Sequence, residues 1–541
     1  MKEILKKSGQ SILLGNEAIV RGSLEAGVQF VTTYPGTPAS EIGNVFSKIA
    51  KQQGVYFEFS TNEKLALEAG IGASFSGLKT LVAMKNFGLN VCSDALLPFL
   101  YTGSKGPFVL VVADDPSCHS SAQSEENSRG FSYLAHIPTL EPSNPKECKE
   151  FIKEAFKISA KFELPVMVRL TTRVAHQRMP VPLSLIKKTN FKGKFVKDRN
   201  RFVTMPPRVL EMKEELLNKI KRMKEFAEKS ELNLLEGKGK KGIITSGVSY
   251  LYVKEVLKEI GLDLPVLKIG IFYPLAEQKI KKFLKNLDSV LIVEELDNYL
   301  EKEVRSIDCN IKILSVKEVG ELSFEDVTEG VMKLLGKRYN KKKEFAIKKV
   351  KHLPRFCIGW PTCPYWKLFS AVKQVAPKNT IFGGDIGCYM MASLPPHNLY
   401  DYLSCMGSGV GIAHGIKKAT NQKIIAFIGD GTFFHSGIPA LLNASYNKSN
   451  PLIIILDNRI TAMTGQQPNP GMGKTGTEES PQIKIEDLLK AMQIKNVRVL
   501  DQEQEYKELV ETIKDFLNKK EMSVIIARRV CGLYHRRQMK K

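Results

Sequence analysis

The chain contains 541 residues, well beyond the ~250–300 at which one hydrophobic core stops growing, so we expect several domains. Hydrophobic residues make up 43% of it and charged residues 25%, which is typical of globular proteins and excludes a disordered, collagen-like or disulfide-scaffold chain. The formal net charge is +23, but the lysines are dispersed and no zinc-finger spacing or basic stripe with interleaved aromatics occurs. We therefore expect no nucleic-acid partner.

The sequence also predicts a cytoplasmic protein that does not cross a membrane. No stretch approaches ~18 consecutive apolar residues, the length that spans a bilayer. Residues 1–7 lack the apolar core and cleavage site of a secretory signal. The nine cysteines are scattered and odd in number, so we interpret them as thiols or metal ligands rather than disulfides.

Residues 1–185 alternate strand-like and helix-like segments, which predicts parallel βαβ units. The expected strands are 28–34, 80–84, 107–113 and 164–170, and the expected helices are 16–26, 62–75 and 145–161. The fold class is therefore α/β, with a parallel sheet covered on both faces.

Basic segments separate the remaining parts of the chain. Residues 186–240 are predicted to form a lysine-rich helical connector, with its helix near 211–231. A smaller α/β domain follows at 241–336, then a basic linker at 337–352 and a third domain at 353–541. The expected elements of the smaller domain are strands 242–246, 265–269 and 289–293, and helices 249–260 and 277–284.

The third domain carries the strongest chemical pattern. An apolar strand at 423–428 leads into Gly429-Asp430-Gly431, which we expect on a loop before a helix at 438–446, with Pro439 near its first turn. A second apolar strand, 451–456, is followed by Asn458. Glycines allow a close approach of a phosphate, and Asp430, the Asn458 side-chain oxygen and the Ile460 carbonyl would supply three ligands to Mg²⁺.

This pattern resembles the diphosphate-binding motif of thiamine diphosphate (TPP) enzymes. The resemblance implies a second, pyrimidine-binding domain that supplies a glutamate, whose carboxylate would promote removal of the thiazolium C2 proton. Residues 61–74 offer two candidates, Glu63 and Glu68. Glu63 fits the comparison better, because it stands nine residues before a Gly-Ala-Ser run, but Glu68 remains an alternative.

A closer resemblance covers nearly the whole chain. It is to the large (alpha) subunits of indolepyruvate ferredoxin oxidoreductases, a branch of the TPP-dependent 2-oxoacid:ferredoxin oxidoreductases. The segments that carry it are 33–41, 84–90, 112–116, 384–389, 404–408, 429–437 and 457–465. The fold implied is a set of transketolase-like TPP-binding domains, and the middle domain resembles the transketolase C-terminal domain.

The resemblance also implies roles for individual residues. Thr37 corresponds to a threonine near the thiazolium ring and the substrate, and two histidines, His119 and His435, are candidates for the substrate end if they are not simply loop residues. The remaining cofactor-binding residues implied are Gly387, Cys388, Met406, Gly407, Ser408, Gly429, Asp430, Gly431 and Asn458.

The reaction implied is the oxidative decarboxylation of an arylpyruvate. An aromatic 2-oxoacid, coenzyme A and two oxidised ferredoxins would give arylacetyl-CoA, CO₂ and two reduced ferredoxins. The expected partners are a smaller beta subunit and ferredoxin, and the expected assembly is a homodimer of heterodimers.

Two departures from the family concern electron transfer and the substrate. No CxxC occurs, so we expect the ferredoxin-like domain with its two clusters to be absent and electrons to leave through another subunit or a docked ferredoxin. The family's CxGCPHR segment is replaced here by one containing Trp360, Tyr365 and Trp366, which would either line the pocket of an aromatic acid or form core packing. Four cysteines would either hold one [4Fe–4S] cluster or remain buried thiols: Cys357, Cys363, Cys388 and Cys531.

Two other functions stay open at this point. The domain order also fits a non-oxidative TPP-dependent decarboxylase or an acetolactate-synthase-like ligase, which would release its product without an electron acceptor. A non-enzymatic scaffold is the third hypothesis. The presence of Glu63, Asp430 and Asn458 argues against the scaffold, because a chain that had lost catalysis would be free to lose these side chains.

Overall fold

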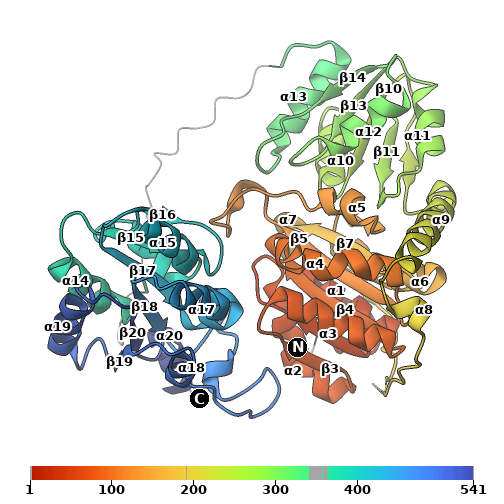
Figure 1. Ribbon diagram of the computed structural model, residues 1–541. Coiled ribbons are helices and arrows are strands. Elements are labelled where there is room, and N and C mark those ends of the chain that lie inside the picture. The colour runs from red at the N-terminus through yellow and green to blue at the C-terminus, as the bar shows by residue number, and fades with distance from the viewer. Residues whose placement is uncertain (1–2, 190–191, 340–355, 358–362, 540–541) are drawn as a thin grey trace. The chain divides into compact units, whose positions relative to one another are not determined.

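Figure 1 shows the computed structural model, in which residues 3–189, 192–339, 356–357 and 363–539 are described. The chain divides into two compact units, Met1–Phe345 and Ala346–Lys541. The predicted linker 337–352 lies outside the described residues except for its first three. In the described part of the chain, no helix is both long and apolar enough to cross a membrane.

A seven-stranded sheet forms the centre of the first unit, in the order β12-β6-β7-β5-β4-β2-β3. All neighbours pair in parallel except the edge strand β12, which pairs antiparallel with β6. The central strands β5 and β7 are buried along their whole length, and β4 is buried except at its last residue, Lys85, as expected for a parallel sheet with helices on both faces. The bounds are β2 Phe30–Thr33, β3 Tyr56–Phe59, β4 Thr80–Lys85, β5 Phe108–Asp114, β6 Thr139–Leu140, β7 Val166–Thr171 and β12 Ile271–Tyr273.

Helices cover this sheet, and their starts follow from local sequence. The Asn144 side chain accepts a hydrogen bond from the Glu147 N–H at 3.0 Å and Pro145 takes the first helical position, so α6 begins where the sequence predicts it. α9 lies along the side of the unit against α4 (Figure 1). The bounds are α1 Gly15–Ala26, α2 Ser40–Gln53, α3 Glu63–Phe75, α4 Asn86–Thr102, α5 Arg129–Ala135, α6 Pro145–Phe162, α7 Thr172–His176, α8 Arg199–Phe202 and α9 Arg208–Lys229; β1 Gly9–Leu14 pairs antiparallel with β8 Arg178–Leu183.

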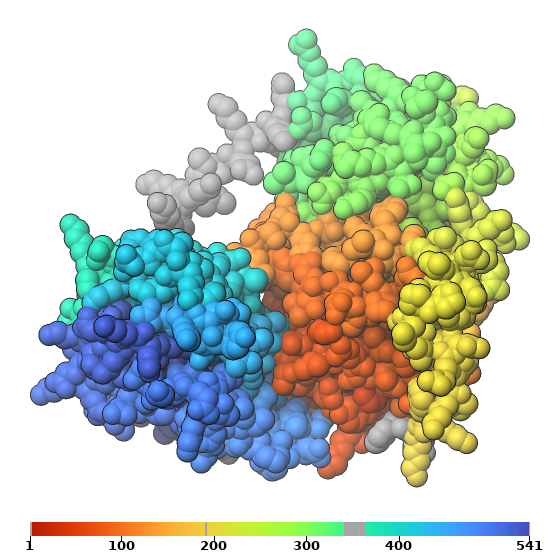
Figure 2. Space-filling view, in the orientation of Figure 1, coloured from red at the N-terminus to blue at the C-terminus, as the bar shows by residue number. Residues whose placement is uncertain are grey.

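A second sheet of five strands, in the order β14-β13-β10-β11-β9, belongs to the same unit. Its residues pack against the first sheet's part of the unit, as the green and orange surfaces of Figure 2 show. The domain boundaries at 185, 240 and 336 remain predictions. The bounds are β9 Leu234–Glu236, β10 Lys241–Ser246, β11 Val266–Ile269, β13 Ser289–Val293, β14 Lys312–Ser315, α10 Ser249–Glu259, α11 Glu277–Leu284, α12 Tyr299–Ile307 and α13 Phe324–Leu335.

Buried charges join these two sheets. The Arg129 guanidinium, 1% exposed as a residue, pairs with Glu141 and with Glu294, at 2.6 Å in each case. Glu295 is also buried, and its Oε1 accepts the Leu322 N–H at 3.1 Å. Strand β12 follows β11 of the second sheet in sequence but pairs with β6 at the edge of the first sheet. These buried charges therefore lie where the chain passes from one sheet to the other.

The second unit contains an all-parallel sheet of six strands, in the order β16-β15-β17-β18-β20-β19. Side chains of β17 alternate: Ile425 and Phe427 join the core under α14 and α19, whereas Ala426 and Ile428 join the core under α15 and α17. The bounds are β15 Ile381–Gly384, β16 Tyr402–Leu403, β17 Ile424–Gly429, β18 Leu452–Asp457, β19 Asn496–Leu500, β20 Ser523–Arg528, α14 Tyr365–Val375, α15 Ser408–Ala419, α16 Asp430–Thr432, α17 Ile438–Tyr446, α18 Ile485–Ala491, α19 Tyr506–Phe516 and α20 Gly532–Met539.

The expectation that Asp430 lies on a loop is wrong. Helical structure begins at Asp430, directly after β17, and continues through a π-helical turn at Phe433–Gly437 into α17. The predicted helix 438–446 is nevertheless confirmed as α17, and Pro439 lies in its first turn.

A pH-dependent stability is expected from Glu295. Burial raises the pKa of its carboxyl to about 7, above the usual 4.5, so the folded state holds a proton that the unfolded state has lost. The contribution of Glu295 to the free energy of unfolding is therefore fully present below about pH 4.5, and it is lost as the pH rises through 7. Glu295→Gln should therefore gain up to about 3 kcal/mol over the wild type between pH 5 and pH 8, measured by thermal unfolding. Glu255→Gln, on the exposed face of α10, is the control, and a gain independent of pH would contradict the assignment.

Candidate active site

Polar side chains follow three neighbouring strands of the second unit at their carboxyl ends. Asp385 follows β15, Asp430 follows β17, and Asn458 follows β18. All three are buried, with exposed fractions of 0%, 4% and 6%. Open parallel sheets bind their ligands at this edge, so the fold brings the predicted Asp430 and Asn458 to one place.

The Asp430 and Asn458 oxygens converge on one backbone amide. The Ile460 N–H donates to Asn458 Oδ1 at 3.1 Å, and its hydrogen bonding also lowers the pKa of Asp430. Burial, with a contribution from the Asp457 carboxylate, outweighs that effect and raises the pKa of Asp430 to about 7. A buried carboxylate beside an amide oxygen is a hard-oxygen donor set, and a divalent cation would offset the cost of burying the charge. The residues present therefore fit Mg²⁺.

Two groups that support these oxygens were not predicted. Asn469 Nδ2 donates to Asp430 Oδ2 at 3.0 Å, while its Oδ1 accepts the Gly471 N–H at 3.0 Å. Tyr365 is buried, and its hydroxyl accepts a hydrogen bond from Asn458 Nδ2 at 2.7 Å, so it fixes which way the Asn458 amide faces. Asn469 lies 39 residues beyond Asp430 in irregular structure, where no sequence motif marks it.

The predicted segment Met406–Ser408 is held at the same edge by Asp385. The Gly407 N–H donates to Asp385 Oδ2 at 2.9 Å, and the Ser436 hydroxyl donates to the Met406 carbonyl at 2.9 Å. Gly407 has φ +82°, and a Cβ there would lie 2.3 Å from Ser436 Oγ, so only glycine fits. Gly387 and Cys388 follow Asp385 directly, so these predicted residues gather with Gly429–Gly431.

The other predicted carboxylate lies at the carboxyl edge of the first unit's sheet. Glu63 follows β3, is 7% exposed and occupies the first position of α3, whose N-cap Asn62 accepts the Leu65 N–H at 2.9 Å. A Cβ on Gly88 would lie 2.7 Å from Glu63 Cγ, so the two helices meet closely here. By contrast, the Glu68 side chain is 40% exposed and pairs with Lys64 at 2.8 Å.

Thr37 lies at this same edge, between β2 and α2. Its carbonyl accepts a hydrogen bond from the Ser120 hydroxyl at 3.2 Å, and Asn16 Nδ2 donates to the next carbonyl, that of Pro38, at 2.7 Å. The loop is thus fixed from two sides. Because β2, β3 and β5 are parallel, Thr37 and Glu63 emerge at one end of the sheet.

The two predicted histidines belong to different units. His119 is exposed, and its Nε2 lies 3.6 Å from Glu321 Oε2. His435 is 7% exposed in the π turn, with Nδ1 3.1 Å from Ser436 Oγ. Their role at the substrate end remains a prediction.

The four predicted cysteines influence one another electrostatically. Burial, with smaller contributions from the neighbouring thiols of Cys357 and Cys531, raises the pKa values of the Cys363 and Cys388 thiols to about 12. Nevertheless, no three His, Cys, Asp or Glu side chains in the described part of the chain are arranged to hold a metal. The [4Fe–4S] cluster on these four cysteines therefore remains a prediction.

Aromatic packing surrounds the predicted Tyr365 and Trp366, whereas Trp360 lies outside the described residues. The Trp366 ring lies 4.9 Å from the ring of His397 and 5.9 Å from that of Phe356. Tyr365 and Phe356 are both core residues. These contacts agree with the core-packing interpretation of the segment.

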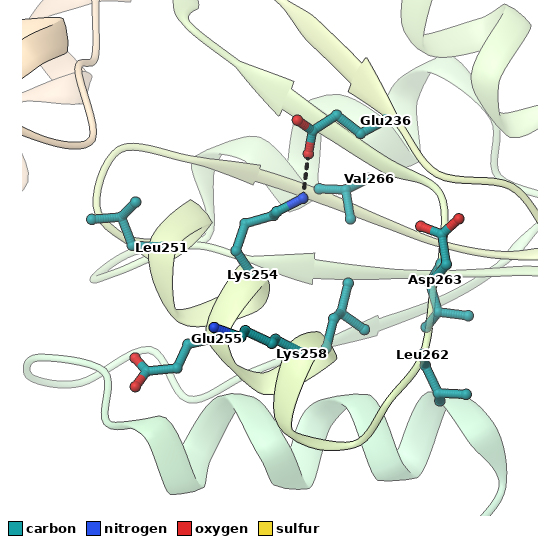
Figure 3. A pocket seen from close by; sticks show the side chains of 10 residues that line it. Glu236, Leu251, Lys254, Glu255, Lys258, Leu262, Asp263 and Val266 are labelled. Atoms are coloured by element: carbon teal, nitrogen blue, oxygen red, sulfur yellow. Dashed lines mark hydrogen bonds and ion pairs between the residues drawn. The ribbon is translucent and has the colours of Figure 1, made fainter.

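Two surface pockets contain none of the predicted residues. One, of about 630 Å³, lies between α10 and the edge of the five-stranded sheet, where Lys254 pairs with Glu236 at 2.8 Å (Figure 3). The other, of about 620 Å³, has apolar walls and several lysines, among them Lys79 and Lys187. Lys79 and Pro107 precede β4 and β5, so this pocket lies at the amino end of the strands, opposite Glu63.

Two protein families match the parts of the chain that contain these two sheet edges. The family described as "Pyruvate flavodoxin/ferredoxin oxidoreductase, thiamine diP-bdg" matches residues 21–228, and "Thiamine pyrophosphate enzyme, C-terminal TPP binding domain" matches residues 385–527. The first range includes Thr37 and Glu63, and the second includes Asp430 and Asn458.

Whole-chain relatives extend the comparison. Indolepyruvate oxidoreductase subunit IorA of Methanothermobacter marburgensis is 42% identical over 540 residues, covering 96% of this chain and 87% of the relative. The subunit of the same name from Thermococcus kodakarensis is 40% identical, covering 99% and 88%. Among solved structures, a 2-oxoglutarate:ferredoxin oxidoreductase from Magnetococcus marinus is similar in fold, with a TM-score of 0.51 and 18% identity over 61% of this chain and 66% of that one.

Tyr365→Phe should weaken the site without disturbing the fold. It leaves the buried Asn458 Nδ2 without its acceptor, which costs about 1–3 kcal/mol and frees the amide to turn. We expect Mg²⁺ binding to weaken about 10-fold, measured by calorimetry. Tyr506→Phe, which removes a hydroxyl bound to Gln374 on the surface, is the control. Unchanged Mg²⁺ affinity in Tyr365→Phe would show that the hydroxyl does not position Asn458.

Proposed function

The chain belongs to the indolepyruvate oxidoreductase subunit IorA family of TPP-dependent 2-oxoacid oxidoreductases, and from that membership we propose that it is the catalytic subunit that oxidatively decarboxylates arylpyruvates. The family resemblance recognised from the sequence is thereby confirmed, as is the α/β fold with TPP-binding domains. The overall reaction proposed converts an arylpyruvate, coenzyme A and two oxidised ferredoxins into arylacetyl-CoA, CO₂, two reduced ferredoxins and a proton.

The observation that carries the proposal is the buried oxygen pair of Asp430 and Asn458. Both lie at the carboxyl edge of a parallel sheet, and Asp430 begins the helical segment that follows β17, whose amino end favours an anion. Two further residues, Asn469 and Tyr365, hold them in place. This arrangement suits a Mg²⁺ ion that binds a diphosphate, with the Ile460 carbonyl as the third protein ligand.

Glu63 supplies the second half of the proposed site. Its carboxyl group is buried at a helix start, where it would share a hydrogen bond with a nitrogen of the pyrimidine ring, whereas Glu68 is engaged with Lys64 on the helix surface. Thiamine diphosphate, when bound, supplies a carbanion centre that attacks the keto carbon and accepts the electron pair released with CO₂. Glu63 would position the proton transfer that activates the cofactor, and the loop that contains Thr37 would lie next to the reacting carbon.

The partners and remaining cofactors follow from the same family. We propose a smaller beta subunit, ferredoxin as the electron acceptor, and a homodimer of heterodimers in the cytoplasm. One [4Fe–4S] cluster on Cys357, Cys363, Cys388 and Cys531 would provide the first step of electron transfer. Its support is the mutual electrostatic influence of those thiols around Tyr365.

Anaerobic viologen reduction by the chain co-purified with its partner tests the proposal. Indolepyruvate should give reduction that depends on coenzyme A. CO₂ release without reduction would replace the proposal by a non-oxidative decarboxylase or ligase. Neither signal, in a sample shown to hold TPP, would exclude indolepyruvate as substrate.

Asp430→Ala should abolish Mg²⁺-dependent TPP binding. The substitution removes the only carboxylate proposed to contact the metal, so we expect a loss of at least about 100-fold in affinity, measured by titration calorimetry. Asp487→Ala, at an exposed position of α18, is the matched control. Tight TPP binding by Asp430→Ala would contradict the metal assignment.

A further inference from the structure

Lys85 ends the central strand β4 and is a charged residue that the proposed site does not yet use. It lies in the segment 84–90, which carries the family resemblance. In the sheet it pairs with Ala113 of β5, and α4 begins at the next residue. The side chain is only partly exposed, at the carboxyl edge that also presents Thr37 and Glu63.

Contacts hold the Lys85 side chain between Thr37 and Glu63. A Cβ on Gly36 would lie 2.7 Å from Lys85 Cβ, so the lysine stem lies against the backbone just before Thr37. Its Nζ donates to the Ser120 carbonyl at 3.3 Å, and the Ser120 hydroxyl in turn donates to the Thr37 carbonyl. Glu63 lies close enough for its charge to act on the Lys85 ammonium.

The ammonium has no close carboxylate partner. No ion pair within 4.0 Å joins Lys85 to an acid among the residues that the structure describes, and its other close contact is the Phe87 ring at 4.9 Å. The acids that act on it from a distance are Asp115, Glu126 and Glu63, together with the Cys118 thiol.

Two of these acids already have other partners. Asp115 accepts hydrogen bonds from Ser120, Ser121 and Thr172, and Glu126 accepts one from Asn90 at 2.9 Å. Burial lowers the pKa of Lys85 to about 8, against the raising effect of these acids. A partly buried cation without a bound anion, at the edge where ligands of parallel sheets bind, is suited to an anionic ligand.

We propose that the Lys85 ammonium binds the carboxylate of the 2-oxoacid substrate. The inference rests on the proposed function, because it needs a 2-oxoacid at this edge. In such an acid the carboxylate is bonded directly to the keto carbon, so a cation beside Thr37 and Glu63 is within reach of it. The phosphates of coenzyme A are separated from its reacting thiol by the whole pantetheine arm, so they would not lie at this point.

The kinetic consequence is specific. The ion pair forms when the acid binds and is absent once the carboxylate has left as neutral CO₂, so Lys85 acts on binding of the 2-oxoacid and not on the later electron-transfer and acyl-transfer steps. Lys85→Met should therefore raise KM for the 2-oxoacid by about 10- to 100-fold, the range of one charge-assisted hydrogen bond. We expect kcat and the KM for coenzyme A to change less than about 3-fold, and Lys85→Arg to restore much of the loss.

Two inhibitors that differ only in the charge of their carboxyl end test whether Lys85 recognises the negative charge of the substrate. On the wild-type complex with its partner and TPP, 3-phenylpropionate should bind more tightly than its neutral amide. Lys85→Met should remove that preference, whereas Lys64→Met, on the exposed face of α3, should keep it. The wild-type preference should fall as the pH rises above about 8, where the ammonium loses its proton, and should persist to higher pH in Lys85→Arg.

Calorimetry of the two inhibitors does not depend on turnover, so it separates this proposal from the proposed function. Failure of viologen reduction with a preserved acid-over-amide preference would overturn the oxidoreductase alone. A raised KM for coenzyme A, or a lower melting temperature of Lys85→Met with the inhibitor preference unchanged, would overturn the role of Lys85. The same KM shift for the 2-oxoacid in a CO₂-release assay would support that role even if the enzyme is not oxidative.

Discussion

The cost of burying the Asp430 carboxylate is the constraint on which the site depends. Its burial and the neighbouring Asp457 raise its pKa to about 7, so an ionised Asp430 needs a compensating charge. The sheet supplies oxygens and amides around it but no cationic side chain among its hydrogen-bond partners in the described residues. A divalent cation and a diphosphate would complete this arrangement, which links the fold directly to cofactor binding.

The first unit also places charged side chains at the carboxyl edge of a parallel sheet, but these charges differ from those of the second unit. Near Thr37, which is fixed between β2 and α2, its carboxyl edge presents the buried carboxylate of Glu63 and the partly buried ammonium of Lys85. In the proposed function, Glu63 would contact the cofactor ring and Lys85, with the opposite charge, would contact the substrate carboxylate. Parallel strands make this separation of roles possible, because each strand contributes its side chain from an independent loop.

Some of these features could be predicted from the sequence and others could not. The apolar strands around Gly429–Gly431, and the position of Asn458, follow from hydrophobic runs and a known spacing. Asn469 reaches Asp430 through irregular structure, which no periodicity encodes. Tyr365 was noticed only as an aromatic residue, because its hydrogen bond to Asn458 is set by tertiary packing. Likewise, the π turn before Pro439 replaces the expected loop because the helix begins directly at the strand end.

The central claim is that Glu63 activates a cofactor held through Asp430. Exchange of the C2 proton of bound TPP with deuterium, followed by NMR on the complex with its partner, tests it most directly. Glu63→Gln should retain TPP but slow exchange by at least about 100-fold, the scale of a lost acid–base group, whereas Glu68→Gln should exchange like the wild type. Exchange at the wild-type rate in Glu63→Gln would contradict the account and make Glu68 the activating carboxylate.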